Sequence, residues 1–133
     1  MELEQLQAFL LQEFPQSSVV IQALTENTAT VRQAIDDSHL RPGGTVSGPV
    51  LMTVADVAMY VALLNKIGIV PLAVTTNLTI NFLRKPAADR AIIGVCSLLK
   101  VGKSQAVGEV SLYSEGNDEV VAHVVCTYAI PPR

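Results

Sequence analysis

The sequence predicts an α+β protein in which a curved antiparallel β-sheet wraps around one long central helix. Two observations lead to this fold class. A long apolar segment with helical spacing occupies about residues 49–66, and β-rich segments follow it over residues 72–130. The chain has 133 residues, and neither an internal repeat nor a linker divides it, so we expect a single domain over residues 1–133.

The residues before the central segment predict a short helix, a hairpin and a loop. Apolar side chains recur at helical spacing over about residues 2–14, and Pro15 ends the run. β-rich stretches flank Glu26 and Asn27, which we interpret as a hairpin turn. Residues 36–48 are rich in Asp, Gly, Pro and Ser and predict a loop.

The central segment carries helix signals at both of its ends. Ser47 or Gly48 can serve as the N-cap, Pro49 suits the first helical position, and Gly68 and Pro71 end the helix. Apolar residues continue on every side, so we expect this helix to be largely buried. Turn residues separate the β-rich segments that follow, and we expect those segments to form consecutive antiparallel hairpins.

The composition is more apolar than one small core explains. Half of the residues are hydrophobic and only 16% are charged, whereas about a quarter is usual for charged residues. We therefore expect a homo-oligomer, a dimer or a dimer of dimers, that buries the excess in subunit interfaces. The formal net charge is −3 and no basic cluster is present, which argues against a nucleic-acid partner.

The cysteines and the apolar stretches predict a cytoplasmic protein. Cys96 and Cys126 stand apart, outside any C-x-x-C motif, and we interpret them as buried apolar side chains in a reducing compartment. The N-terminus is acidic, unlike a signal peptide. Residues 47–64 fall short of the roughly 20 apolar residues that span a bilayer and contain Asp56, so we expect no membrane partner. No His and Cys cluster, P-loop or G-x-G-x-x-G motif is present, and we expect neither a metal nor a cofactor.

Asp56 is the sharpest functional signal, because it is a carboxylate in the middle of an apolar helix. Two explanations are structural: backbone N–H groups or a buried Arg satisfy it, or it turns toward solvent. The functional explanation is a carboxylate that faces an apolar cleft and works there as a general base or nucleophile.

The start of the helix offers a second catalytic candidate. Gly48 can present its N–H as an oxyanion donor at the positive end of the helix dipole, whereas Pro49 has no N–H; an ordinary N-cap is the alternative. Eight helical residues separate Gly48 from Asp56, or roughly 12 Å, which is too far for both to reach one carbonyl. Two antiparallel copies across a two-fold axis can instead combine Gly48 of one chain with Asp56 of the other.

The remaining polar residues form weaker patterns. His39 lies in the loop before the helix, where it is a proton shuttle, a substrate contact or a solvated side chain. His123 lies among apolar residues, and we interpret it as a structural strand residue. Ser47 is not in a G-x-S-x-G motif, which argues against a catalytic-triad hydrolase. Four cations near strand ends either meet the phosphates of a nucleotide-like ligand or are solvated charges: Arg84, Lys85, Lys100 and Lys103.

Four short motifs occur in an order that resembles a known family. They are "GGTVSGPVLMTVADVAMYVAL", "VTTNLTINFLRKPA", "VGKSQAVGEVSLYSE" and "VVAHVVCTYAI". Together they resemble the hot-dog fold, and within it the phenylacetate-degradation PaaI type of acyl-CoA thioesterase. The resemblance covers roughly residues 35–130, and it implies hydrolysis of an acyl-CoA to a free acid and CoA.

The resemblance implies a role for particular residues. The helix of the family begins with G-x-x-H-G-G, and an acid follows eight positions after the first glycine of H-G-G; these positions are Gly48 and Asp56. The Gly48 N–H would polarise the thioester carbonyl, and Asp56 of the neighbouring subunit would act as nucleophile or as base for water. A hydroxyl at the start of the next strand helps to position the water, which matches Thr75, with Thr76 as the alternative register. The substrate-binding residues that we expect, along a subunit groove for coenzyme A, are Ser47, His39, Arg41, Pro49, Thr76, Arg84, Lys103 and Ser104.

The sequence departs from the family motif at three positions. Ser47 replaces the histidine, Pro49 replaces the second glycine, and Arg41 stands where an asparagine is often found. Loss of the asparagine and the histidine removes polar groups that orient the thioester and the water, so the substrate range or the turnover would differ. We favour a thioesterase over a non-catalytic acyl-CoA or CoA binder. A hot-dog dehydratase or hydratase ranks last, since it needs an acid–histidine pair for which His39 is the only candidate.

Overall fold

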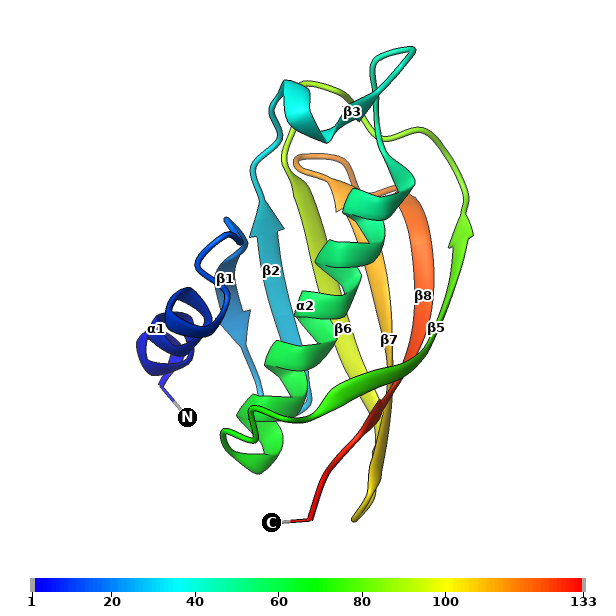
Figure 1. Cartoon of the computed structure of the whole chain (residues 1–133). Coiled ribbons are helices and arrows are strands. Elements are labelled where there is room, and N and C mark those ends of the chain that lie inside the picture. The colour runs from blue at the N-terminus through cyan, green and yellow to red at the C-terminus, as the bar shows by residue number, and fades with distance from the viewer. Residues whose placement is uncertain (1, 133) are drawn as a thin grey trace.

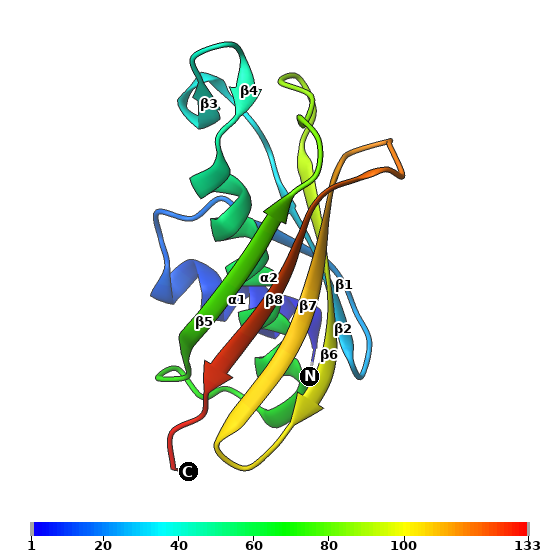
Figure 2. The same ribbon diagram turned by 90° about the vertical axis from the view of Figure 1, so that its right-hand side faces the viewer.

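The computed structural model describes residues 2–132, and in it a six-stranded antiparallel sheet curves around one long helix (Figures 1 and 2). This arrangement confirms the predicted fold class. The elements in chain order are α1 (Leu3–Glu13), β1 (Val20–Leu24), β2 (Thr28–Gln33), the 3-10 turn η1 (Asp37–His39), β3 (Leu40–Arg41), β4 (Thr45–Val46), α2 (Gly48–Ile67), β5 (Val74–Phe82), β6 (Ile92–Val101), β7 (Gln105–Ser114) and β8 (Val120–Ala129).

The helices start and end within two residues of the expected positions. The helix expected over about residues 2–14 is α1, and the one expected over about residues 49–66 is α2, with Pro49 in its first turn. The loop expected over residues 36–48 contains the short hairpin of β3 and β4. The description of the chain as a single domain stays a prediction.

The strand order, β1-β2-β6-β7-β8-β5, differs from the predicted run of consecutive hairpins. Strands β6, β7 and β8 do pair in sequence, but β5 pairs with β8 and not with β6. The chain leaves β5 at the edge of the sheet and crosses the end of the sheet to reach β6 (Figure 2). The prediction was wrong here because side-chain alternation defines the two faces of a strand but not its partner. As a result β5 has one edge without a partner strand among residues 2–132.

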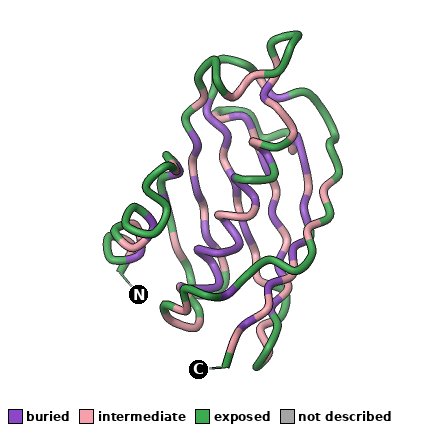
Figure 3. The backbone as a smooth tube through the Cα atoms, viewed as in Figure 1, coloured by how far each residue is buried: buried purple, intermediate pink, exposed green. Residues whose placement is uncertain are grey.

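Helix α2 buries one side against β6, β2 and β7 and leaves the other side partly open (Figure 3). Leu51, Leu63 and Leu64 are among its fully buried side chains. Thr53 is exposed and Asp56 half-buried on the open side. The helix is thus largely buried, as expected, but one side stays partly open because the sheet curves around only part of it.

A glycine in β7 sets how closely α2 approaches the sheet. A Cβ atom at Gly108 would lie 2.6 Å from the Sδ of Met59 and 3.3 Å from the backbone oxygen of Ser97. The Met59 side chain is completely buried and also contacts Cys96, with 3.9 Å between the two sulfurs. Any larger residue at Gly108 would push the helix or its side chain away, because protein cores are close-packed.

Helix α2 is also the one described helix that is long and apolar enough to cross a membrane, with a mean hydropathy of 1.6 over its most apolar window. We expected this segment to be too short, and that expectation was wrong, because the helix continues to Ile67 and reaches 20 residues. Of that window, 56% is buried inside the protein, as is usual for a helix at the centre of a sheet.

Candidate active site

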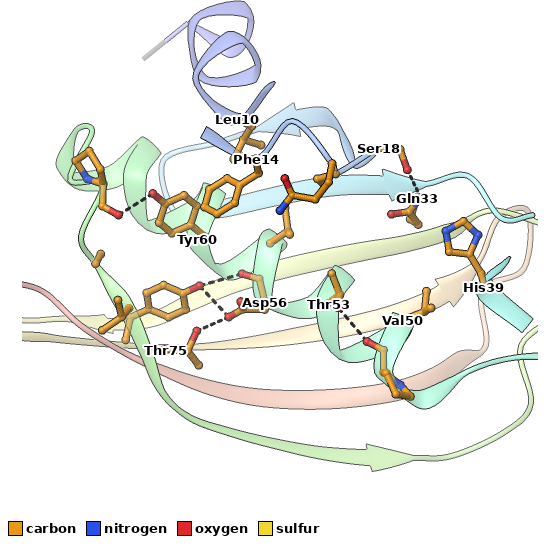
Figure 4. Close-up of a pocket in the computed structure, with 18 residues that line it drawn as sticks. Leu10, Phe14, Ser18, Gln33, His39, Val50, Thr53, Asp56, Tyr60 and Thr75 are labelled. Carbon is orange, nitrogen blue, oxygen red and sulfur yellow. Dashed lines mark hydrogen bonds between the residues drawn. The ribbon is translucent and has the colours of Figure 1, made fainter. Parts of the chain in front are cut away.

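Asp56 is held by two hydroxyl groups that come from different strands (Figure 4). Thr75 Oγ1 of β5 donates a hydrogen bond to Asp56 Oδ1 at 2.5 Å, and the Tyr128 hydroxyl of β8 donates to the same oxygen at 2.8 Å. The other carboxylate oxygen, Oδ2, accepts no hydrogen bond from residues 2–132. Among residues 2–132 neither a backbone N–H nor an Arg donates to Asp56, so the first structural explanation does not describe its surroundings. The side chain does lie on the open side of the helix, but two hydroxyls hold it there.

The register of β5 and β8 places both hydroxyls beside Asp56. Thr75 lies opposite Tyr128 in the ladder, and directly opposite residues project to the same face of a sheet. The ladder then shifts by one residue, so that Asn77 pairs with Thr127 and Thr76 is the extra residue of a bulge. Thr76 donates instead to the backbone oxygen of Thr127, at 3.3 Å. Of the two threonines that the sequence left open, Thr75 is therefore the one that contacts Asp56.

Two side chains of β8 that lie near Asp56, Tyr128 and Cys126, stay protonated. Burial, and then the negative charge of Asp56, raise the pKa of the Tyr128 hydroxyl far above its ordinary value. Burial and the same charge raise the pKa of the Cys126 thiol to about 12, and burial raises that of Cys96 to about 12 as well. Both cysteines are free and buried, as expected. Tyr128 is thus a donor to Asp56 and not a proton acceptor.

Asp56 lines a cavity of about 720 Å³ that is mostly apolar. One end is aliphatic and aromatic: Leu10 of α1 and Phe14, just after α1, face Tyr60 of α2 (Figure 4). The rings of Phe14 and Tyr60 meet edge to face, with 5.7 Å between their centroids. The opposite end reaches His39 in the loop before α2. The carboxylate of Asp56 lies between these two ends (Figure 4).

Gly48 lies at the start of α2 and is not among the residues that line this cavity. Its N–H donates no hydrogen bond within residues 2–132. A Cβ at this position would lie 3.1 Å from the ring of Phe82, at the end of β5. Gly48 and Asp56 belong to one continuous helix, so the separation of about 12 Å follows from the helical rise. One chain therefore cannot bring both groups to the same carbonyl.

The residues expected near the helix start are only partly brought together. His39 and Pro49 line the cavity, whereas Ser47 and Arg41 do not. The backbone oxygen of His39 accepts a hydrogen bond from Ser47 N at 2.9 Å, which places His39 beside the helix start as expected. Its Nδ1 accepts from the backbone N–H of Asp36 at 2.9 Å and closes the η1 turn. Ser47 is the N-cap of α2 but makes no capping hydrogen bond with its side chain.

The cations expected to meet phosphates lie at opposite ends of the sheet. Arg84 N donates to the oxygen of Val121 at the start of β8, whereas the backbone oxygen of Ser104 accepts from Ile130 N just after its end. Ile130 lies nine positions after Val121 along the extended chain, which corresponds to about 30 Å. Lys103, next to Ser104, and Arg84 therefore cannot hold the same phosphate within one chain. Arg84 is itself fixed by Val120 and Glu119, at 2.6 Å and 3.5 Å.

Sequence reasoning assigned no role to Tyr128, although a signal for it exists. Val124, Cys126 and Tyr128 alternate along one strand, so all three project inward, and a buried tyrosine hydroxyl needs a hydrogen-bond partner. Gln33 was missed as well: it is buried, lines the cavity and donates to Ser18 at 2.7 Å. Of the large side chains of α2, Tyr60 lines the cavity, whereas Met52 and Met59 do not.

The other polar residues take structural positions. His123 Nε2 lies 3.2 Å from the carboxylate of Glu109 on the neighbouring strand, in agreement with a structural strand histidine. Among the described residues no group of three or more His, Cys, Asp or Glu side chains forms a metal-binding cluster.

Comparison with known proteins identifies the family of this chain. It belongs to the thioesterase superfamily, whose family model matches residues 43–121. It is 43% identical to a candidate thioesterase from Silicibacter sp. TM1040, with a TM-score of 0.92 over 99% of this chain and 93% of the other. The predicted resemblance to hot-dog thioesterases is confirmed.

Two more distant structures share the fold. Thioesterase superfamily member 2 from zebra fish is 19% identical, with a TM-score of 0.87 over 98% of this chain and 99% of the other. A point mutant of the phenylacetic acid degradation protein PaaI from Thermus thermophilus is 21% identical, with a TM-score of 0.76 over 93% of this chain and 99% of the other. No curated protein matches the sequence.

Proposed function

We propose that the protein is an acyl-CoA thioesterase in which Asp56 is the nucleophile or general base. The observation that carries this proposal is the half-buried Asp56 carboxylate, oriented by two hydroxyls in the middle of a mostly apolar cavity. Membership of the thioesterase superfamily supplies the reaction class. An apolar cavity favours a reacting carboxylate, because water that would otherwise solvate the charge is excluded.

The reaction has two routes that the site supports equally. As a general base, Asp56 takes a proton from water while the water oxygen attacks the thioester carbonyl. As a nucleophile, the carboxylate attacks the carbonyl itself and water then hydrolyses the mixed anhydride. In both routes the C–S bond breaks, CoA leaves as a thiolate that takes up a proton, and the free acid is released. Thr75, hydrogen-bonded to Asp56, lies next to the place of the attacking water.

The oxyanion donor of this site would be the Gly48 N–H of the partner subunit. Within one chain Gly48 is about 12 Å from Asp56, and its N–H has no acceptor among the described residues. The outer edge of β5 has no partner strand in the part of the chain that the structure describes, and Val74 and Phe82 at its two ends are each 55% exposed. Edge strands of this kind pair readily with another strand. A two-fold contact along β5 would set the two α2 helices antiparallel and bring Gly48 of the partner subunit toward Asp56.

The two ends of the cavity would hold different parts of the substrate. The aromatic end at Phe14 and Tyr60 suits an acyl group. The contact between Gly48 and Phe82 places the nearby Arg84 at the helix-start end, together with Lys85 and Arg90. These cations suit the phosphates of coenzyme A.

An acyl-CoA panel tests this function directly. We expect thioester hydrolysis by the purified wild-type protein and a loss of at least roughly 10³-fold in kcat for Asp56→Asn and Asp56→Ala, since the reacting carboxylate is removed. Asp56→Asn also keeps the size of the side chain, and circular dichroism checks the folding of both variants. An Asp56→Asn protein as active as wild type would exclude this role for Asp56.

The alternative is an acyl-CoA or CoA binder without turnover. It is favoured by the Ser47 side chain, which makes no capping contact where the family has a histidine. Calorimetry with CoA and with a non-hydrolysable acyl-CoA analogue separates the two functions, because a binder shows affinity in the absence of hydrolysis. No binding and no hydrolysis would exclude both. We place the protein in the cytoplasm, in keeping with its buried free thiols.

A further inference from the structure

We propose that Tyr128 is a positioning residue that holds Oδ1 of Asp56 and thereby presents Oδ2 to the thioester or to the attacking water. This inference rests on the proposed role of Asp56. The Tyr128 hydroxyl lies 2.8 Å from Oδ1 and 3.3 Å from the backbone oxygen of Asp56. The residue is 3% exposed, so the hydroxyl is shielded from water that would compete for the same carboxylate.

The hydrogen bonds distinguish the two oxygens of the carboxylate. Thr75 and Tyr128 both donate to Oδ1, and a carboxylate oxygen has two lone-pair directions. Oδ1 is therefore fully occupied. Oδ2 has no donor among the described residues, and Asp56 is part of the cavity wall. The chemistry of Asp56 is then assigned to Oδ2.

At this site hydroxyl groups, and not a cation, hold the Asp56 carboxylate. None of the residues that line the cavity is a Lys or an Arg. The ionisable groups that face Asp56 are Tyr128 and Cys126 of β8, Tyr60 on its own helix and His39 at the end of the cavity; Thr75 of β5 does not ionise. Hydrogen bonds to a carboxylate favour its charged form. Loss of one donor should therefore make Asp56 harder to ionise.

Tyr128 is the more rigid of the two donors. Its ring packs beside that of Tyr60, with 6.0 Å between the ring centroids, whereas the Thr75 side chain lies on an exposed edge strand. A group fixed by its own packing keeps the group that it contacts in one orientation. Tyr128 thus sets the carboxylate rotamer that Thr75 alone leaves free to turn.

The test is the Tyr128→Phe variant, which removes the hydroxyl and keeps the ring. We expect kcat to fall about 10- to 100-fold with little change in KM, as for loss of an interaction used in the transition state. We also expect the acid limb of the kcat/KM profile to move to higher pH, because a carboxylate that loses a hydrogen-bond donor ionises less readily. Circular dichroism and thermal unfolding verify that the variant folds.

Tyr60→Phe is the matched control. It also loses a buried hydroxyl, which donates to Pro71 at 3.2 Å and not to Asp56, so its acid limb should stay in place whatever happens to KM. An acid limb of Tyr128→Phe that coincides with the wild type, in an enzyme that needs Asp56, would overturn the inference while the proposed function stands.

A second measurement does not need activity. Carbon-13 NMR of aspartate-labelled protein, with the Asp56 signal assigned by its absence in Asp56→Asn, follows the titration of this carboxyl directly. We expect its midpoint to be higher in Tyr128→Phe than in wild type, and equal midpoints would refute the positioning role. If the wild type hydrolyses no thioester, the proposed function fails by itself, and this titration still decides whether Tyr128 controls Asp56.

Discussion

The two ends of the interval from Gly48 to Asp56 differ in how much of their surroundings one chain supplies. At Asp56, Thr75 and Tyr128 of the same chain occupy one carboxylate oxygen. At Gly48, the N–H has no acceptor within residues 2–132, and the nearest side chain is the exposed ring of Phe82. The comparison teaches that one chain surrounds the carboxylate proposed to react and leaves the proposed oxyanion donor without a partner. This is the asymmetry expected of a site that two subunits share.

The largest expected effect comes from the open end. Gly48→Pro removes the N–H at a helix start where proline is well tolerated, and we expect kcat to fall about 10²- to 10³-fold, the usual cost of an oxyanion donor. Gly48→Ala keeps the N–H and meets only the exposed Phe82 ring, which can move, so it should retain most of the activity. Steady-state assays compare the two, and equal rates would show that the Gly48 N–H takes no part.

A mixed dimer tests whether the Asp56 and the Gly48 of one active site belong to different chains. Asp56→Asn and Gly48→Pro chains are co-expressed with different tags, and the mixed dimer is isolated by tandem affinity purification. One of its two sites then combines an intact Asp56 with an intact Gly48, so about half of the wild-type activity per dimer should return. If both groups came from one chain, the mixed dimer would be as inactive as its parents.

A smaller effect is expected at the complete end. Thr75→Val removes one of the two donors to Asp56 while Tyr128 remains, and we expect kcat to fall about 10-fold, since a hydrogen bond to a charged group contributes about 1.5–3 kcal/mol. Thr75→Ser keeps the hydroxyl and serves as the control. A Thr75→Val enzyme that matches Thr75→Ser would mean that the Tyr128 hydroxyl suffices.

The smallest effect is expected from thiol labelling, which tests whether the core behind Asp56 opens. Cys96 and Cys126 are buried, and burial raises the pKa of each thiol to about 12, so almost no thiolate exists at pH 8. We expect no reaction of the native protein with Ellman's reagent over an hour, and two reactive thiols per chain after unfolding in urea. Rapid labelling of the native protein would show that the surroundings of Asp56 open readily.

The sequence predicted the parts of this molecule that depend on local spacing. The long helix, its start at Ser47 and Gly48, and the interval to Asp56 all follow from the helical period. The position of β5 does not, because a strand edge accepts any partner that is compatible in register. Tyr128 is remote from Asp56 in sequence, and only the pairing of β5 with β8 brings Thr75 and Tyr128 to the same carboxylate.

The contacts of the cations could not be predicted from the sequence either. Arg84 and Lys103 both lie at strand ends, and strand ends alternate between the two sides of an antiparallel sheet. Which ends coincide depends on the crossover from β5 to β6, which no local pattern records. The expectation that they meet one ligand therefore needs either two subunits or two separate ligands.

The space that Gly108 leaves for Met59 sets the gap between α2 and the sheet. Asp56 lies three residues before Met59 on the same rigid helix, so the distance from its carboxylate to the Tyr128 hydroxyl depends on that gap. A methyl group at Gly108, on a strand that contributes nothing to the cavity wall, would thus act as a wedge between helix and sheet. Its consequence would be a change in catalytic alignment that arises from the core of the protein, on the side of the helix that no substrate reaches.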